Sequence, residues 1–318
     1  MRVLVTGAAG FIGSHLVLAL LERGDEVSAI DNLFSGDAHR LAPWLDRIRF
    51  VEGDVRDPSA LDRAAAGCDA ILHQAAIASV AASVRDPIGN DAVNSGGTIQ
   101  VMLAAARNGC RRVVLAGSSA VYGSSTEPPG RETQVPDPQS PYAASKLAAE
   151  SYLHAMSPLL GVETVALRYF NVFGPGQDPM SEYAAAVPRF VTGALRGQVL
   201  TIYGDGRQSR DFTYVTNVVA ANLLALDAPG VDGLTCNVGT GSSVTLLELV
   251  GAIEAAVGRP VTVQHEAPRA GDVRDSRAAI DLAVARLGYR VQVAFAEGIR
   301  ETVSWYRSQE PVGRASGS

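Results

Sequence analysis

The feature that most constrains the fold is an alternation of short β-rich runs with helical patterns along the first half of this 318-residue chain. The predicted strands cover residues 2–6, 26–30, 48–52, 70–73, 112–116 and 164–168. The predicted helices between them cover residues 11–23, 61–66, 98–107 and 142–157. Because the strands are apolar on both sides, they need a layer of helices on each face. The sequence therefore predicts an α/β fold with a doubly wound parallel sheet.

The alternation ends after residue 171, which predicts a change of architecture. Residues 174–179 and 204–210 are rich in Gly, Pro and polar side chains and read as loops, while residues 246–257 read as a helix. We predict a first domain at 1–172, rejoined by about 213–240. Residues 173–212 and 241–310 would form a smaller mixed α/β domain, and 311–318 a polar tail.

Composition excludes several classes of function. The formal net charge of −6 argues against a nucleic-acid or anionic-membrane partner. Cys68, Cys110 and Cys236 are far apart and lack metal-ligand spacing, which favours a reducing compartment and no metal site. We find neither a secretion signal nor an apolar run of the roughly 18 residues that span a bilayer. We therefore expect a cytoplasmic protein.

A glycine-rich turn follows the first predicted strand and leads into the first predicted helix. Its sequence, Gly-Ala-Ala-Gly-Phe-Ile-Gly at residues 7–13, lets the backbone turn tightly and approach a pyrophosphate at the positive end of the helix. Asp31 ends the next strand, where a carboxylate accepts hydrogen bonds from ribose hydroxyls and repels a 2′-phosphate. Asp54 and Val55 follow the third strand and are expected near the adenine. This pattern predicts NAD as cofactor rather than NADP.

The chain has a single lysine, Lys146, and the other 26 of its 27 basic residues are arginine. Tyr142 lies four residues earlier on the same face of a predicted helix. An ammonium beside a phenol stabilises the phenolate and lowers its pKa, so that tyrosine can act as a base near neutral pH. A chance Tyr-x-x-x-Lys on a surface helix is the alternative, which the glycine turn and the unique lysine disfavour.

Several motifs together resemble the extended short-chain dehydrogenases/reductases of the nucleotide-sugar epimerase/dehydratase group. They are TGAAGFIGSH (6–15), DNLFSG (31–36), GDVRD (53–57), HQAA (73–76), SSAVYG (118–123), SPYAASK (140–146), RYFNVFGPGQDP (168–179), YGDGRQSRDFTYV (203–215) and RAGDVRDS (269–276). The resemblance implies a Rossmann domain that binds NAD and a smaller domain that binds a nucleotide sugar. It also implies a homodimer paired through the helices at 98–107 and 142–157.

The resemblance implies a catalytic triad of Ser118, Tyr142 and Lys146, with Ser119 as the fallback for Ser118. Tyr142 would take the proton of the sugar 4-hydroxyl as the C4 hydride passes to NAD, and Lys146 would also hold the nicotinamide ribose. The 4-keto sugar would then turn over in the pocket, and the hydride would return to its other face. The result is inversion at C4 without net oxidation.

The resemblance also assigns the remaining binding residues. The cofactor set is Gly7, Gly10, Phe11, Ile12, Gly13, Asp31, Asn32, Asp54, Val55, Gln74, Ala75, Ala76, Asn94, Tyr142, Lys146 and Tyr169. The substrate set is Ser79, Ser118, Ser119, Asn171, Val187, Thr201, Tyr203, Arg210, Arg269, Asp272 and Ser276. Arg210 and Arg269 would clamp the diphosphate, because guanidinium groups bind phosphates in a bidentate way. A local ion pair between Arg210 and Asp211 is the alternative for the first of them.

Within the family, the absence of the additional acidic residues that dehydratases and decarboxylases carry favours epimerisation. A 4,6-dehydratase usually carries Asp-Glu directly after the catalytic Ser/Thr, and a decarboxylase carries Glu at the second of these positions, whereas this chain has Ser119 and Ala120. The small Ser276 at the expected gate position favours an N-acetylated sugar. We therefore predict an NAD-dependent 4-epimerase of UDP-GlcNAc/UDP-GalNAc, of UDP-Glc/UDP-Gal, or of both. Open alternatives are a UDP-uronic acid epimerase, a dehydratase or reductase and, from another class, an NAD(H)-sensing binding protein.

Overall fold

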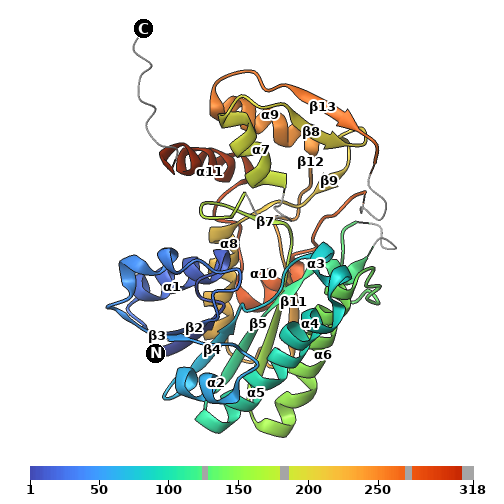
Figure 1. Cartoon of the computed structure of the whole chain (residues 1–318). Helices are drawn as coiled ribbons and strands as arrows, with labels where there is room; N and C mark the ends of the chain where they lie inside the picture. The colour runs from blue at the N-terminus through green and yellow to red at the C-terminus, as the bar shows by residue number, and fades with distance from the viewer. Residues whose placement is uncertain (124–127, 180–185, 269–273, 310–318) are drawn as a thin grey trace.

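The computed structural model describes residues 1–123, 128–179, 186–268 and 274–309 (Figure 1). Its centre is a seven-stranded sheet with the order β11-β6-β5-β4-β1-β2-β3, in which every neighbouring pair is parallel. The strands are β1 Arg2–Thr6, β2 Glu26–Asp31, β3 Ile48–Glu52, β4 Ala70–His73, β5 Arg112–Ser118, β6 Glu163–Tyr169 and β11 Leu234–Val238. The predicted parallel α/β sheet is confirmed.

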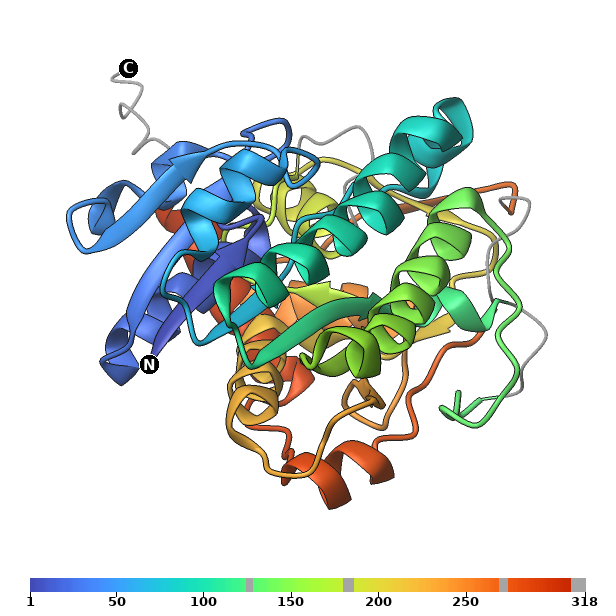
Figure 2. The same ribbon diagram turned by 90° about the horizontal axis from the view of Figure 1, so that it is seen from below.

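Two layers of helices cover the sheet, as its apolar strands require (Figure 2). One layer comprises α1 Phe11–Arg23, α8 Val215–Asp227 and α10 Asp281–Leu287, and the other comprises α2 Pro58–Ala65, α5 Gly97–Asn108 and α6 Pro141–Leu160. Alternate residues of β1 serve the two layers: Val3 and Val5 belong to the apolar core beneath α1, and Leu4 belongs to the core beneath α2 and α5. The predicted helices of this half are confirmed, with small shifts at their ends.

The segment before α5 holds helical turns that the sequence analysis did not predict. They are α3 Val80–Arg85, α4 Pro87–Asp91 and a π-helical turn at Ala92–Gly96 that continues into α5. Shorter 3₁₀ turns lie at Ala38–Arg40, Ala42–Trp44 and Ser119–Tyr122. The polar Asn90, Asn94 and Ser95 obscure the apolar periodicity here, yet all three are buried in the fold.

The remaining elements form most of a second lobe above the carboxyl ends of the strands (Figure 1). They are β7 Val172–Phe173, α7 Ala186–Leu195, β8 Leu200–Tyr203, β9 Ser209–Arg210, β10 Thr213–Tyr214, β12 Val244–Thr245, α9 Leu246–Val257, β13 Val263–Glu266 and α11 Phe295–Gln309. Strand pairs β8–β13 and β7–β10 are parallel, whereas β9–β12 is antiparallel. Ser209 and Arg210 thus form a strand where a loop was predicted. The domain boundaries stay a prediction.

A cluster of aromatic rings lies within this lobe. Phe173 lies edge-on to Phe212, Tyr214 and Phe295, with ring centroids 5.6–6.4 Å apart. Such pairs stabilise packing by roughly 0.5–1.5 kcal/mol beyond the area they bury. The cluster brings β7, β10 and α11 together and so shapes the wall that faces the carboxyl edge of the sheet. No helix within the described ranges is long and apolar enough to cross a membrane.

Candidate active site

The glycine turn between β1 and α1 has no room for side chains. Gly7 has φ +64°, and a Cβ built on it would lie 2.7 Å from the Ala75 nitrogen. A Cβ on Gly13 would lie only 2.0 Å from the Gly7 oxygen. Helix α1 begins after Gly10 without a side-chain cap, so the N–H groups of its first turn are left for a ligand. This is the cradle that a dinucleotide pyrophosphate fits.

Asp31 lies beside this turn at the end of β2. Its carboxylate accepts hydrogen bonds from the backbone N–H groups of Ala9 (2.9 Å) and Leu33 (2.8 Å). Burial raises the pKa of Asp31, and these two hydrogen bonds oppose the rise. The acidic group predicted to select NAD therefore also holds the glycine turn in place.

Asp54 and Val55, the two residues predicted to lie near the adenine, have different surroundings. The Asn32 amide donates to the Asp54 carboxylate at 2.8 Å, and Arg56 pairs with the same carboxylate at 2.7 Å. The Arg56 hydrogen bond lowers the pKa of Asp54 to about 2. Val55 is buried against Gly97, where an added Cβ would lie 2.8 Å from its side chain.

Ser118 ends β5, and Tyr142 and Lys146 lie one turn apart on α6, which packs against β5. The Ser118 and Tyr142 side chains share a hydrogen bond. Burial raises the pKa of Tyr142, and this hydrogen bond opposes the rise. Burial is thus the dominant influence on Tyr142 in the chain by itself, and the lowering of its pKa by Lys146 stays a prediction.

Lys146 is only 4% exposed. Burial lowers the pKa of Lys146 to about 8, while the Glu150 charge raises it. A buried ammonium is costly unless a partner accepts its hydrogen bonds. The ribose hydroxyls of a dinucleotide are acceptors of this kind, so Lys146 and the glycine turn both fit NAD.

Replacing Lys146 with methionine should raise the free energy of unfolding of the cofactor-free chain by about 3 kcal/mol at pH 7. The reason is that folding lowers the pKa of this ammonium from 10.5 to about 8. Between these values the unfolded chain holds a proton that the folded chain lacks, so wild-type stability rises with pH through this window. The gain should therefore be largest below pH 8 and shrink toward pH 10.5.

Urea unfolding of both proteins at pH 7 and at about pH 9.5 measures the effect of this substitution. A Lys146→Met variant that is less stable than wild type at pH 7 would contradict this prediction.

His73, in the HQAA motif, is a site residue that the sequence analysis did not assign. Thr98 donates to the Asn94 carbonyl (2.6 Å), so the His73 Nε2–H donates to Thr98 (3.1 Å) and Nδ1 accepts from Thr6 (2.7 Å). The Ala75 N–H in turn donates to the Thr6 hydroxyl at 3.2 Å. Burial, with a smaller contribution from Lys146, lowers the pKa of His73 to about 3. The neutral imidazole therefore fixes the loop at Gln74–Ala76 without adding a second cation.

Two residues of the predicted cofactor set hydrogen-bond inside the protein. The Asn94 side chain accepts from the Ile77 N–H (2.8 Å) and donates to Ser145 on α6 (3.0 Å). The Tyr169 hydroxyl donates to the Gln74 side chain at 3.3 Å and accepts from the Asn222 amide at 2.8 Å. Both side chains thus fix the walls of the site, and their contacts with NAD stay predictions.

A cavity of about 280 Å³ opens between β7, α7, β8 and β9. Its lining contains Asn171, Val187, Thr201, Tyr203 and Arg210 from the predicted substrate set. It also contains residues that the sequence analysis missed, among them Arg189, Phe190, Gln208, Phe212 and Leu246. Gln208 and Phe212 lie in the motif at 203–215 but were not assigned to the substrate, whereas no motif marks Arg189, Phe190 and Leu246, which belong to α7 and α9.

Arg210 is not engaged with its neighbour Asp211 in the way the alternative interpretation supposed. The Asp211 carboxylate accepts hydrogen bonds from the backbone of Thr240 (2.8 Å), Gly241 (3.1 Å) and Ala278 (3.1 Å). Asn171, whose φ of +27° is rare for a residue with a side chain, donates to the Asp211 carbonyl at 3.2 Å. Asp211 therefore anchors the wall of the cavity, while the Arg210 guanidinium donates to the carbonyls of Ser209 (2.9 Å) and Arg274 (3.1 Å).

The remaining predicted substrate residues are placed as follows. Ser79 caps α3 through a hydrogen bond from the Ala82 N–H (3.0 Å), and Ser119 begins a 3₁₀ turn after Ser118. The Ser276 N–H donates to the Ser209 carbonyl at 3.0 Å, which puts Ser276 alongside β9. Arg269 and Asp272 lie outside the described residues. Within the described ranges, no three His, Cys, Asp or Glu side chains are grouped to hold a metal ion.

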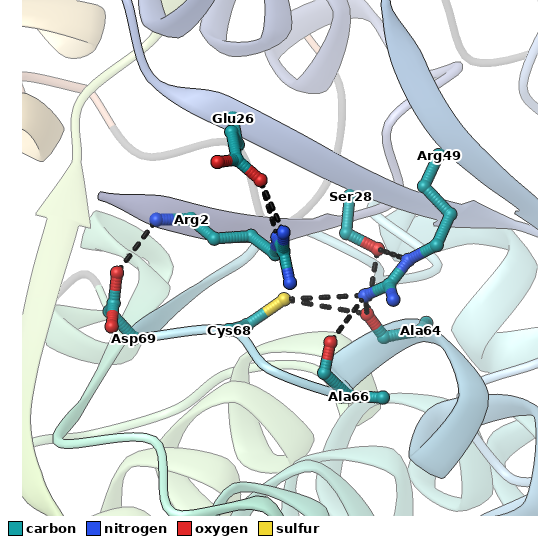
Figure 3. A network of polar contacts seen from close by, with 8 residues as sticks. All are labelled: Arg2, Glu26, Ser28, Arg49, Ala64, Ala66, Cys68 and Asp69. Carbon is teal, nitrogen blue, oxygen red and sulfur yellow. Dashed lines mark hydrogen bonds and ion pairs between the residues drawn. The ribbon is translucent and has the colours of Figure 1, made fainter.

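A larger cavity of about 500 Å³ lies at the amino ends of β1 and β2, opposite the glycine turn. Two of its arginines, Arg2 and Arg49, belong to the polar network in Figure 3. Arg2 pairs with Glu26, while Arg49 donates to Ser28 (3.1 Å) and to the Ala64 carbonyl (2.6 Å) at the end of α2. These guanidinium groups already have internal partners, so we assign the chemistry to the carboxyl edge of the sheet.

Comparisons with known proteins agree with this assignment. Residues 3–239 match the NAD dependent epimerase/dehydratase family. A UDP-glucose 4-epimerase of Mycolicibacterium smegmatis is 41% identical over 313 residues, which cover 97% of this chain and 99% of that protein. Dehydratases and a probable UDP-glucuronate 4-epimerase are also among the relatives.

The chain is also similar to solved structures of epimerases. A UDP-glucose 4-epimerase from Thermus thermophilus, in complex with NAD, is 39% identical with a TM-score of 0.88, covering 97% of this chain and all of that one (100%). A UDP-N-acetylglucosamine 4-epimerase from Methanobrevibacter ruminantium, in complex with UDP-N-acetylmuramic acid, is 38% identical with a TM-score of 0.92, covering 97% and 98%.

Proposed function

The chain belongs to the NAD-dependent epimerase/dehydratase family, and from this premise we propose that it is a 4-epimerase of UDP-hexoses. The observation that carries the proposal is the hydrogen bond between the Ser118 and Tyr142 side chains, with the buried Lys146 one turn further along α6. Ser119 and Ala120 follow Ser118 where a dehydratase carries an acid and a base. A site with one proton-transferring group is suited to oxidise and reduce the same carbon, and it lacks the groups needed to expel water.

Each catalytic side chain has a distinct part in the proposed reaction. Tyr142 takes the proton from the sugar 4-hydroxyl and later returns it, while the Ser118 hydroxyl donates to the same oxygen and orients it. NAD, when bound, accepts the C4 hydride and gives it back. Lys146 holds the nicotinamide ribose, and its positive charge favours the Tyr142 phenolate. Since burial lowers the pKa of Lys146 only to about 8, it is mostly charged at neutral pH.

The cavity between β7 and β9 is the proposed site of the uridine diphosphate. Arg210, Asn171 and Tyr203 lie in its lining, together with the previously unassigned Arg189. Two arginines supply the charge that a diphosphate requires. Ser276 lies beside β9 and carries a small side chain, which supports an N-acetylated sugar among the substrates.

We expect the protein to interconvert UDP-GlcNAc with UDP-GalNAc, or UDP-Glc with UDP-Gal, without added reductant. The test incubates it with UDP-GlcNAc, UDP-Glc, UDP-glucuronic acid and dTDP-glucose and separates the products by chromatography. A 4-epimer as the only product from a UDP-hexose supports the proposal. A 4-keto-6-deoxy sugar from dTDP-glucose, or turnover of the uronic acid alone, would replace it with a dehydratase or a uronate epimerase.

Two further expectations rest on the family resemblance and stay predictions. One is a homodimer paired through α5 and α6, which pack against each other along one face of the sheet. The other is a cytoplasmic location.

A further inference from the structure

The loop after β7 is held by three side chains from distant parts of the chain. His15 on α1 donates from Nε2 to the Pro175 carbonyl (2.9 Å), and Arg40 donates from Nη2 to the Gly176 carbonyl (2.9 Å). The Tyr306 hydroxyl on α11 donates to the next carbonyl, that of Gln177. Three consecutive carbonyl groups are thus bound by the first helix, the segment after β2 and the last helix.

Arg40 differs from the other two residues because it also contacts the glycine turn. Its Nη1 group donates to the Ala9 carbonyl at 3.1 Å. The N–H of Ala9 donates to Asp31, so the Ala9 peptide is held on one side by a carboxylate and on the other by a guanidinium. These contacts hold the peptide at the centre of the turn that fits the pyrophosphate.

The loop that Arg40 binds begins where the substrate cavity ends. Asn171, Val172 and Phe173 line that cavity and lead directly into the loop at Gly174. Gly176 has φ +82°, a conformation that glycine adopts without strain, and its carbonyl is the one that faces Arg40. One guanidinium therefore connects the cofactor turn with the segment that forms the cavity wall.

We propose that Arg40 is a positioning residue that couples the NAD site to the nucleotide-sugar site. Its fork donates to two carbonyls from two segments, which the point charge of a lysine cannot reproduce with the same geometry. Without it, both the turn and the loop lose a charged hydrogen bond, so cofactor and substrate bind more weakly while the reacting groups on α6 and β5 are unchanged. The expected effect on nucleotide-sugar binding rests on the proposed function, whereas the expected effect on NAD binding rests on family membership alone.

The test compares Arg40→Met, Arg40→Lys and the control Arg47→Met. Arg47 is an exposed arginine nearby in sequence that lines the cavity at the opposite edge of the sheet, so its substitution removes the same charge without touching the site. The readouts are the NAD dissociation constant by calorimetry, the fraction of NAD retained after gel filtration, and KM and kcat with the best UDP-sugar.

For Arg40→Met we expect an NAD dissociation constant about 10-fold higher, equivalent to about 1.4 kcal/mol, and a KM several-fold higher. The kcat at saturating NAD and sugar should stay within about twofold of wild type, Arg40→Lys should be intermediate, and Arg47→Met should match wild type.

An unchanged NAD dissociation constant in Arg40→Met, or a fall in kcat with unchanged NAD binding, would overturn the proposal. If Arg40→Met melts at a much lower temperature than wild type without NAD, the comparison uses Arg40→Lys instead. The proposal then requires that Arg40→Lys binds NAD more weakly than Arg47→Met does. If the wild-type protein turns over no UDP-hexose but Arg40→Met still binds NAD more weakly, the proposed role of Arg40 at the NAD site is supported. Only the proposed function is then rejected.

Discussion

Replacing Tyr142 with phenylalanine should lower kcat about 10²- to 10⁴-fold, the range that a positioned general acid–base group contributes. The substitution removes one hydroxyl and its hydrogen bond to Ser118 and leaves the half-buried ring in place. Burial raises the pKa of Tyr142 in the chain alone, and the proposed mechanism has the Lys146 charge favour its phenolate. Single-turnover reduction of bound NAD by the UDP-sugar measures the proton-coupled step directly.

The matched control for this variant is Tyr152→Phe on the same helix. Tyr152 is 47% exposed, so the loss of its hydroxyl should change neither turnover nor stability. Tyr142→Phe should keep the wild-type melting temperature to within a few degrees and should bind NAD. Wild-type turnover in a folded Tyr142→Phe protein would refute the proposed chemistry.

Replacing Glu150 with glutamine should lower the free energy of unfolding by about 3 kcal/mol, because it leaves a buried guanidinium without its counter-ion. Glu150 lies one turn after Lys146 on α6 and is 7% exposed, and Arg168 on β6 is 4% exposed. Arg168 donates to both Glu150 oxygens, at 2.9 and 2.6 Å, and to the Tyr122 hydroxyl at 3.0 Å. Urea unfolding at constant pH gives the measurement.

Two further variants show whether the loss comes from the unpaired charge. The double variant Glu150→Gln with Arg168→Met removes the orphaned charge and should recover a large part of the lost stability. Asp62→Asn removes one partner of the exposed pair with Arg107, whose side chains are 40% and 43% exposed, and should cost less than about 1 kcal/mol. Equal losses from Glu150→Gln and Asp62→Asn would show that burial does not determine the strength of the pair.

Local patterns in the sequence predicted much of this protein. The strands of the sheet from β1 to β6 could be placed because each is a short apolar run between turn residues. The glycine turn could be assigned because its glycines, at 7, 10 and 13, stand between a predicted strand and a predicted helix. Tyr142 and Lys146 could be paired because a helix brings residues four apart onto one face.

The helical turns at residues 80–96 were missed for the opposite reason. Asn90, Asn94 and Ser95 are polar, so no apolar period marks the segment, and their burial depends on partners such as Ile77 and Ser145. Arg189 could not be assigned to the cavity, since only the packing of α7 on β8 brings it to the lining that Tyr203 and Arg210 share.

The amino-acid sequence by itself determined the alternating strands and helices, the glycine turn and the spacing of Tyr142 and Lys146, since each is a pattern of residues close together in the chain. The alternation in turn implied a parallel sheet. The tertiary structure decided which way the His73 ring donates, what Asp211 and Glu150 bind, and that Arg40 joins Ala9 to Gly176. These contacts link residues up to 136 positions apart, and no local pattern encodes a partner at that separation.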